Sequence, residues 1–352
     1  MTSVKRLALF LTAILMAGHA HAATVIKIAT LVPQNTAWGS KIDAGRKEIA
    51  ARTDERVKLK IYYGGVQGHA GKVKQRIRFG QLHGGDFTPT DFQDSMPDLN
   101  IYGLPFVFQS NEEVAYVRSR MDETLSAGFE EQGLVTFGFA GEFAIVLSNE
   151  PVRSLEDLRG KQIWLPEGDS ISDRAMKRLQ LVPNSKPISD VITGLRTGLF
   201  DVVAAPPAAA VALQWHTSVK YFTDMPVLYA MSFMAIDKRV FNKLSAGDQA
   251  IVSEVLRRVY KEINDNGPLD AANAKDALAN SGIQSVQPAD GELEKIRRVM
   301  ADNNRDMARQ GLFSLQLLEQ MQGHIADFRN GSMNAGDVVV GDAAESVANG
   351  NR

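Results

Sequence analysis

The sequence of 352 residues contains no cysteine. This absence excludes disulfide bonds, thiol nucleophiles and thiolate metal ligands, and it also excludes lipid attachment at an N-terminal cysteine. A chain of this length must then be stabilised by a sizeable hydrophobic core, and the length favours two domains. The composition, with 44% hydrophobic and 23% charged residues, is ordinary for such a globular protein.

An excess of positive charge is lacking as well. The chain has 39 basic residues, Lys and Arg together, against 41 acidic residues. Proteins that bind nucleic acid or an anionic membrane surface need a basic patch to attract phosphate groups. We therefore expect no nucleic acid and no membrane surface among the partners.

Patterns of catalytic and metal-binding residues are also missing. Beyond residue 22 the histidines are His69, His83, His216 and His324, and no two of them stand four residues apart. There is no G-x-S-x-G elbow, and the glycine-rich stretch 64–72 lacks the residues with which a phosphate loop binds phosphate and magnesium. We expect no metal, no cofactor and no enzymatic activity.

The first 22 residues have the pattern of a secretory signal peptide. Lys5 and Arg6 precede a short apolar run, and Ala20 and Ala22 supply the small residues of a cleavage site. Cleavage after about Ala22 removes two of the 39 basic residues and leaves 37 against 41 acidic ones. We expect a soluble periplasmic protein. An uncleaved anchor is the alternative, although the run is too short to span a bilayer.

Apolar runs typical of strands alternate with helical patterns along the chain. The expected strands cover residues 24–31, 56–65, 134–141, 144–149, 161–166, 201–206 and 227–237. This alternation predicts an α/β fold with largely parallel sheets.

The longest helical pattern begins after Ser245, a residue type favoured as an N-cap, and carries Val255 and Val259 on one face. The segment 264–268 reads NDNGP, and we expect its proline to break or kink the helix. The segment 331–352 is rich in Gly, Ala, Asn and Asp, and we expect it to be disordered.

Several stretches resemble the P subunit of TRAP transporters, the DctP-like extracytoplasmic solute receptors of tripartite ATP-independent uptake systems. The stretches are VIKIATLVPQNTAWG, DLNIYGLPFVF, NEPVRSLEDLRGKQIWLPEGD, VITGLRTGLFDVVAAPP and FMAIDKRVFNKLSAGDQ. They occur in unbroken order over roughly residues 25–325.

The resemblance implies a two-domain periplasmic binding protein fold, with a hinge between the lobes and a long spine helix. Lobe I would comprise residues 23–143 and 233–268, and lobe II residues 144–232 and 269–330. The implied function is reversible, non-catalytic binding of a small molecule in the cleft between the lobes. Closure of the lobes would precede delivery to the small and large membrane subunits of the transporter.

Most described members of this family grip a carboxylate with an arginine on the strand that ends in Val-Pro, through a bidentate, charge-assisted pair. Matching GKQIWLP to that strand puts Trp164 at the arginine position, with Ala144 and Ala205 at two further polar positions. Because a buried carboxylate without an ionic partner costs on the order of several kcal/mol, the match predicts a hydrophobic or amphipathic ligand. A register shifted by one or two residues would instead make Trp164 a core residue.

The resemblance places ten further residues near the cleft. The aromatic and methionine side chains would form an adaptable apolar lining, and the two polar ones would orient the ligand. These residues are Trp38, Phe87, Phe92, Phe143, Trp215, Tyr229, Met231, Phe233, Gln67 and Thr88.

Three other functions remain open from the sequence. An organic-acid receptor could use Arg153, Arg174 or Arg196 from a shifted position. A catalytic periplasmic α/β protein is disfavoured by the missing nucleophile and metal patterns. A sensory adaptor would present its ligand to a histidine kinase instead of a transporter.

Overall fold

The computed structural model describes residues 23–348 of the chain, and it describes side chains up to residue 331. The expected signal peptide, residues 1–22, and the chain end, residues 349–352, lie outside the described residues.

One mixed sheet organises the described part of the chain. Its strands follow the order β2-β1-β3-β9-β5-β8-β6-β7, and β4 and β10 both pair with β9. The strands are β1 (Thr24–Ala29), β2 (Val57–Tyr62), β3 (Gly84–Phe87), β4 (Leu134–Thr136), β5 (Ala140–Ser148), β6 (Ile163–Pro166), β7 (Pro183–Lys186), β8 (Val202–Ala205), β9 (Tyr221–Asp237) and β10 (Gln284–Val286). Every expected strand segment overlaps one of them.

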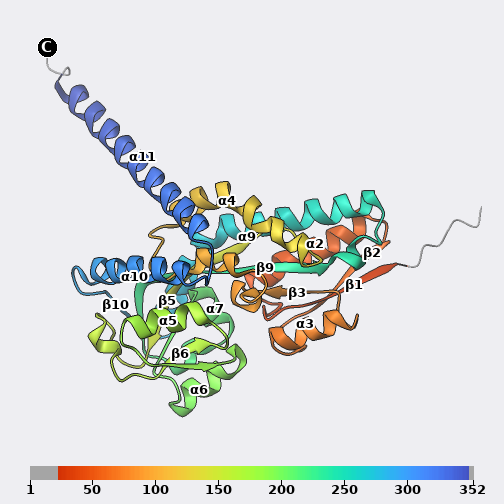
Figure 1. Cartoon of the computed structure of the whole chain (residues 1–352), viewed down its shortest axis with the longest axis horizontal. Helices are drawn as coiled ribbons and strands as arrows, with labels where there is room; N and C mark the ends of the chain where they lie inside the picture. The colour runs from red at the N-terminus through yellow and green to blue at the C-terminus, as the bar shows by residue number, and fades with distance from the viewer. Residues whose placement is uncertain (1–22, 349–352) are drawn as a thin grey trace, which may run out of the picture.

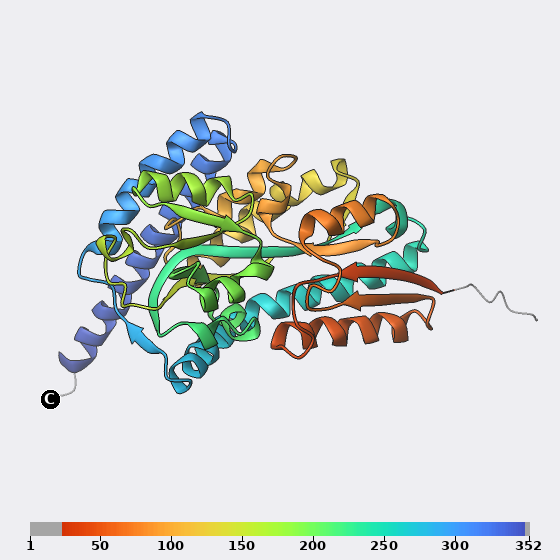
Figure 2. The same ribbon diagram turned by 90° about the horizontal axis from the view of Figure 1, so that it is seen from below.

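The long strand β9 connects the two halves of the molecule (Figure 2). It has 17 residues, and its C-terminal end pairs with β3 and β4 while its N-terminal part pairs with β5 and β10. Because β9 runs antiparallel to β3, β4 and β5, and β5 also runs antiparallel to β8, the sheet is mixed and not largely parallel as expected. The result is an α/β architecture in two domains, as the sequence predicted.

Helices cover both halves of the sheet (Figure 1). Several begin at side chains that satisfy free backbone N–H groups, such as Ser245, whose hydroxyl accepts from the N–H of Asp248 at 3.1 Å. The α-helices are α2 (Ala37–Arg52), α3 (Ala70–Arg78), α4 (Asn111–Glu131), α5 (Ser170–Arg178), α6 (Val191–Thr197), α7 (Pro207–Ala212), α8 (Lys238–Phe241), α9 (Ala246–Asn280), α10 (Glu292–Arg309) and α11 (Leu315–Ala348). Short 3₁₀ turns occur at η1 (Pro89–Phe92), η2 (Pro97–Gly103), η3 (Glu156–Leu158), η4 (Ile188–Asp190) and η5 (Trp215–Ser218).

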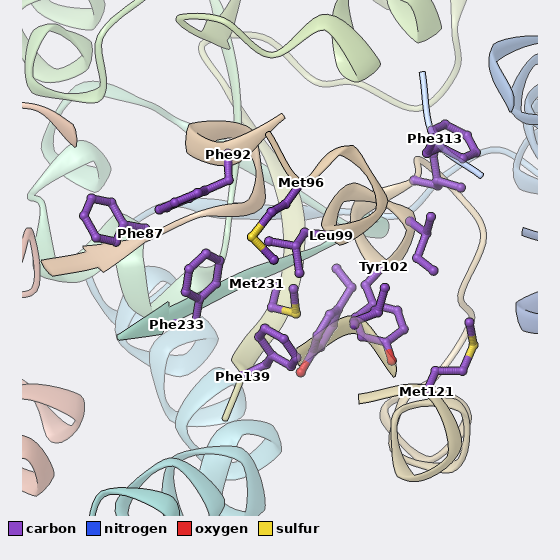
Figure 3. Packing of buried hydrophobic residues seen from close by; sticks show 14 of the residues in the cluster. Phe87, Phe92, Met96, Leu99, Tyr102, Met121, Phe139, Met231, Phe233 and Phe313 are labelled. Carbon is purple, nitrogen blue, oxygen red and sulfur yellow. The ribbon is translucent and has the colours of Figure 1, made fainter. Parts of the chain in front are cut away.

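A cluster of aromatic side chains forms the core beneath β3 and β9 (Figure 3). Phe233 is fully buried and meets Phe139 edge to face, with ring centroids 5.8 Å apart. Phe87 and Phe92 pack against it and against each other, at 5.3 Å between their own centroids. Because each such pair adds about 0.5–1.5 kcal/mol beyond its buried area, this cluster holds β3 firmly against β9.

The expected break of the long helix at residues 264–268 does not occur. Helix α9 runs for 35 residues as one helix, with Pro268 inside it. Proline has no N–H to donate to the carbonyl of Asn264, four residues earlier, but Pro268 is exposed and its ring lies on the outer side of the helix. Packing of α9 against α2 in one half and against α7 and β10 in the other keeps both sides of the proline helical.

Replacing Pro268 with alanine is expected to raise the free energy of unfolding by about 1–3 kcal/mol, because it restores the missing hydrogen bond to Asn264. Urea unfolding followed by circular dichroism measures this difference. The neighbouring substitution Leu269→Ala, at a side chain that is 61% exposed, is the control and should change stability by less than about 0.5 kcal/mol. A destabilised Pro268→Ala variant would contradict this account of the helix.

The C-terminal segment belongs to a long helix. Helix α11 continues through Gly331 to Ala348 and extends away from the body of the protein (Figure 1). Its first part is anchored, since Arg329 Nε donates to Glu113 Oε1 at 2.7 Å and the Glu113 side chain is buried.

Candidate functional site

A cavity of about 830 Å³ lies between the two halves of the molecule. Its walls include the segments that directly follow parallel strands: Thr30 after β1, Gln67 in the loop after β2, Thr88 after β3, Glu167 after β6 and Pro206 after β8. The carboxyl ends of parallel strands gather at one edge of a sheet, and this edge is where α/β proteins bind ligands. The two sheet halves thus contribute their ligand-binding edges to the same cavity.

The structure brings together most of the residues that the sequence singled out. The ones that line the cavity are Trp164, Ala144, Ala205, Trp38, Gln67, Phe87, Thr88, Trp215, Tyr229 and Met231. Their contact with a ligand stays a prediction.

Phe143 lies outside the cavity lining, and the alternation of side chains along β5 explains why. Its neighbours Glu142 and Ala144 line the cavity, so the side chain between them points to the other face. There Phe143 packs edge to face on Tyr229, at 5.6 Å between ring centroids. Sequence reasoning missed Glu142, although its place two residues before Ala144 puts both on the same face of the strand.

Trp164 is a buried core residue that also forms part of the cavity wall. Its side chain is 5% exposed, its Nε1 donates to the carbonyl of Lys186 at 2.9 Å, and its ring meets Trp215 edge to face at 5.4 Å. Ala205 belongs to the same buried cluster. The hydrogen bond satisfies the only polar group of the indole, so this wall offers a ligand an apolar surface.

The two predicted polar contacts already have hydrogen-bond partners close to them in the sequence. Gln67 Oε1 accepts from Arg76 Nη1, and the hydroxyl of Thr88 binds Asp91 Oδ2 at 3.0 Å. By contrast, Nε1 of Trp38 is buried without a hydrogen-bond partner.

Two of the predicted apolar residues form the cavity floor over the aromatic core. Phe87 and Met231 lie beside Phe233 in Figure 3, on the neighbouring strands β3 and β9. Both are almost fully buried, which fixes the shape of this part of the wall.

The sequence matches the DctP family, described as bacterial extracellular solute-binding protein, family 7, over residues 28–310. The chain belongs to this family. Its members are solute-binding receptors, so the protein is a receptor and not an enzyme.

Relatives and solved structures agree with this assignment. A solute-binding protein of Verminephrobacter eiseniae is 25% identical over 249 residues, which are 69% of this chain and 73% of that protein. A similar structure is DctP7 of Bordetella pertussis, an extracytoplasmic solute receptor binding pyroglutamic acid, with a TM-score of 0.79, 18% identity and coverage of 86% of this chain and 100% of that one. A TRAP periplasmic solute-binding protein of Sulfurospirillum deleyianum, with bound succinate, has a TM-score of 0.79, 16% identity and coverage of 86% and 99%. These likenesses show that the family fold is present.

In this member of the family, the cavity is poor in positive charge. Among the described residues that line it, Lys74, Arg153 and His69 are the basic ones, and all three are exposed. Arg174 and Arg196, the other arginines considered from the sequence, are exposed and lie outside the lining.

Asp86 and Glu142 both border the cavity and have no cationic partner among the contacts of the described residues. Burial raises the pKa of Asp86 to about 7, even though hydrogen bonds from Thr30 and Tyr260 favour its charged form. Burial likewise raises the pKa of Glu142 to about 7, against a hydrogen bond from the backbone N–H of Ala208. Both carboxyl groups therefore titrate near neutral pH.

Among the described residues, 23–348, no cluster of three or more His, Asp or Glu side chains could hold a metal ion. None of the helices described there is long and apolar enough to cross a membrane.

Proposed function

We propose that this chain is the periplasmic receptor of a TRAP-type uptake transporter, and that its cavity binds an amphipathic solute with an apolar buried part. The proposed ligand class rests on the position and packing of Trp164. It stands where the family pattern would place a carboxylate-binding arginine, and it forms an apolar wall with Trp215 and Ala205. A carboxylate buried against this wall would lose water without gaining an ionic partner.

The receptor cycle follows from the two-domain fold. Lobe I, residues 23–143 with 233–268, and lobe II, residues 144–232 with 269–330, close over the ligand. A solute that touches both lobes stabilises only the closed state, which then docks on the small and large membrane subunits. The signal peptide directs export and is removed after about Ala22.

Identification of the bound solute tests the proposal. Native mass spectrometry of the purified protein, followed by solvent extraction, should reveal an apolar or amphipathic molecule of about the cavity's size. Tight binding of succinate or D-glucuronate in calorimetry, with no binding of amphipathic molecules, would contradict it.

The substitution Trp164→Arg is expected to weaken binding of the amphipathic solute at least tenfold and to create affinity for succinate. The reason is that a guanidinium offers a carboxylate a bidentate partner and removes the apolar wall. Isothermal titration with both ligands measures the change.

The control is Trp164→Phe, which keeps an aromatic wall and should keep the ligand preference. Since a buried arginine also threatens folding, Ala209→Arg, at a half-buried position of α7 that lines the cavity, supplies a second variant. If the variants that fold all retain the wild-type ligand preference, Trp164 is structural only and the proposed ligand class fails.

A second candidate is a receptor for organic acids that uses Arg153. The observation in its favour is that Arg153 borders the cavity, and the solved relatives described above hold acids. The substitution Arg153→Gln separates the two candidates, because it should abolish binding of an acid and leave binding of an apolar solute unchanged.

A further inference from the structure

The charge of the cavity lining points beyond an apolar ligand. Eight acidic side chains line the cavity, against the exposed cations Lys74 and Arg153. Most of these acids have a local partner: Asp169 caps α5, for example, and Asp270 pairs with Lys41 at 3.3 Å. A cleft with this balance repels an anion and attracts a cation.

Among the described acids of the lining, Asp94 and Glu167 also lack such a partner but are exposed, whereas Glu142 is half-buried. Its side chain borders the cavity and is partly exposed there, while its Oε1 is enclosed and has no hydrogen-bond partner. The backbone N–H of Ala208 is the donor that reaches this carboxylate. A carboxylate that is half enclosed and without a counter-ion is unfavourable unless something in the cavity compensates its charge.

The charged groups around Glu142 cannot supply this compensation. Lys275 of α9 is the nearby cation, and its Nζ is bound to Asp224 at 2.7 Å. Asp270, on the same helix, carries a charge of the same sign as Glu142 and raises its pKa further. A cation that pairs with the ionised form of Glu142 therefore has to come from the ligand.

We propose that Glu142 binds the protonated amino group of the solute, so that the ligand class is an organic amine with an apolar or aromatic body. This inference rests on the proposed receptor function and specifies its substrate. The amino group lies beside Glu142, and the apolar body lies along Trp164 and Trp215.

Matched sets of small molecules test the proposal on the full mature chain. Each set keeps one apolar body and varies the end group between an amine, an alcohol and a carboxylate. The first set is 2-phenylethylamine, 2-phenylethanol and 3-phenylpropionate. The second set consists of tryptamine with its alcohol and acid, and the third of hexylamine with its alcohol and acid. Calorimetry at about pH 8, where Glu142 is ionised, should show that the best-bound amine binds at least tenfold more tightly than its alcohol and its acid.

The substitution Glu142→Gln should remove this preference. It should lower the affinity for the amine at least tenfold and change the affinity for the alcohol less than threefold. Glu131→Gln, an exposed glutamate at the end of α4 outside the cavity lining, is the control and should leave all affinities unchanged. Amine affinity of the wild type should also fall as the pH is lowered through about 7, and Glu142→Gln should weaken that dependence, because Asp86 is then the remaining lining carboxyl that titrates in this range.

If no amine binds more tightly than its alcohol, the inference is wrong. In that case, binding of the alcohols or acids with apolar bodies would leave the proposed receptor function standing. Binding of succinate or D-glucuronate alone would overturn the proposed ligand class together with the inference.

Discussion

Replacing Arg118 with methionine is expected to lower the free energy of unfolding by about 3–5 kcal/mol. Arg118 is 11% exposed and joins four segments of the chain. Its guanidinium donates to Asp122 at 2.9 Å on its own helix α4, and to the carbonyl of Phe139 at 2.7 Å just before β5. It also donates to the hydroxyl of Tyr229 on β9 at 3.2 Å and to Asn264 Oδ1 on α9 at 3.0 Å.

The cost arises because methionine fills the space but leaves these acceptors without their donor in a buried setting. Urea unfolding at neutral pH measures it. Arg118→Lys should recover part of the loss, since an ammonium keeps the charge but cannot reach all four groups at once.

The matched control is Arg120→Met on the same helix. Arg120 is exposed and lies over the ring of Tyr116 at 3.4 Å, so its loss should cost less than about 1 kcal/mol. A loss at Arg118 no larger than at Arg120 would show that the network does not stabilise the fold.

This network also shows where prediction from the sequence ends. Arg118 and Asn264 are 146 positions apart, and nothing in either local pattern indicates that the two side chains meet. The segment around Asn264 predicts a helix break because proline lacks an N–H. Packing at both ends of α9, which only the tertiary structure reveals, overrides that local preference.

The strands were predictable to the extent that their sequences carry apolar or β-branched runs. β1 and β2 do, and the structure confirms them. β3 (GGDF) and β7 (PNSK) do not, and they are strands because each pairs with a longer or more apolar neighbour. Strand propensity is weak where sheet contacts decide.

The candidate site was predictable where its residues belong to a recognisable sequence motif. The Gly-Lys-x-x-x-x-Pro frame led to Trp164, which lines the cavity. Phe143 was chosen for its aromatic ring, although its neighbour Ala144 faces the cavity and two adjacent strand residues face opposite ways. Glu142 and Asp86 were missed because a single carboxylate in a strand shows no sign of burial until its neighbours are placed.

Replacing Asp86 with asparagine is expected to make the protein more stable at pH 8 than the wild type, with a gain that vanishes near pH 4. The pKa of Asp86 is raised from 3.8 to about 7, chiefly by burial and further by Asp91, against hydrogen bonds from Thr30, Tyr260 and Ser232. Between these two pKa values the unfolded chain has released the proton and the folded chain has kept it. Stability of the wild type therefore falls as the pH rises from about 4 to about 7, and then levels off.

The size of this effect follows from the displacement of the pKa, at about 1.4 kcal/mol for each unit, which gives at most about 4 kcal/mol at pH 8. Urea unfolding of wild type, Asp86→Asn and the exposed control Asp276→Asn at about pH 4.5 and pH 8 measures it. Any loss of hydrogen-bond quality in the amide is independent of pH and cancels when the two pH values are compared. A difference between Asp86→Asn and wild type that stays constant from pH 4.5 to pH 8 would show that Asp86 is ionised at ordinary pH in the folded protein. The aspartate would then add a second fixed negative charge to the cavity.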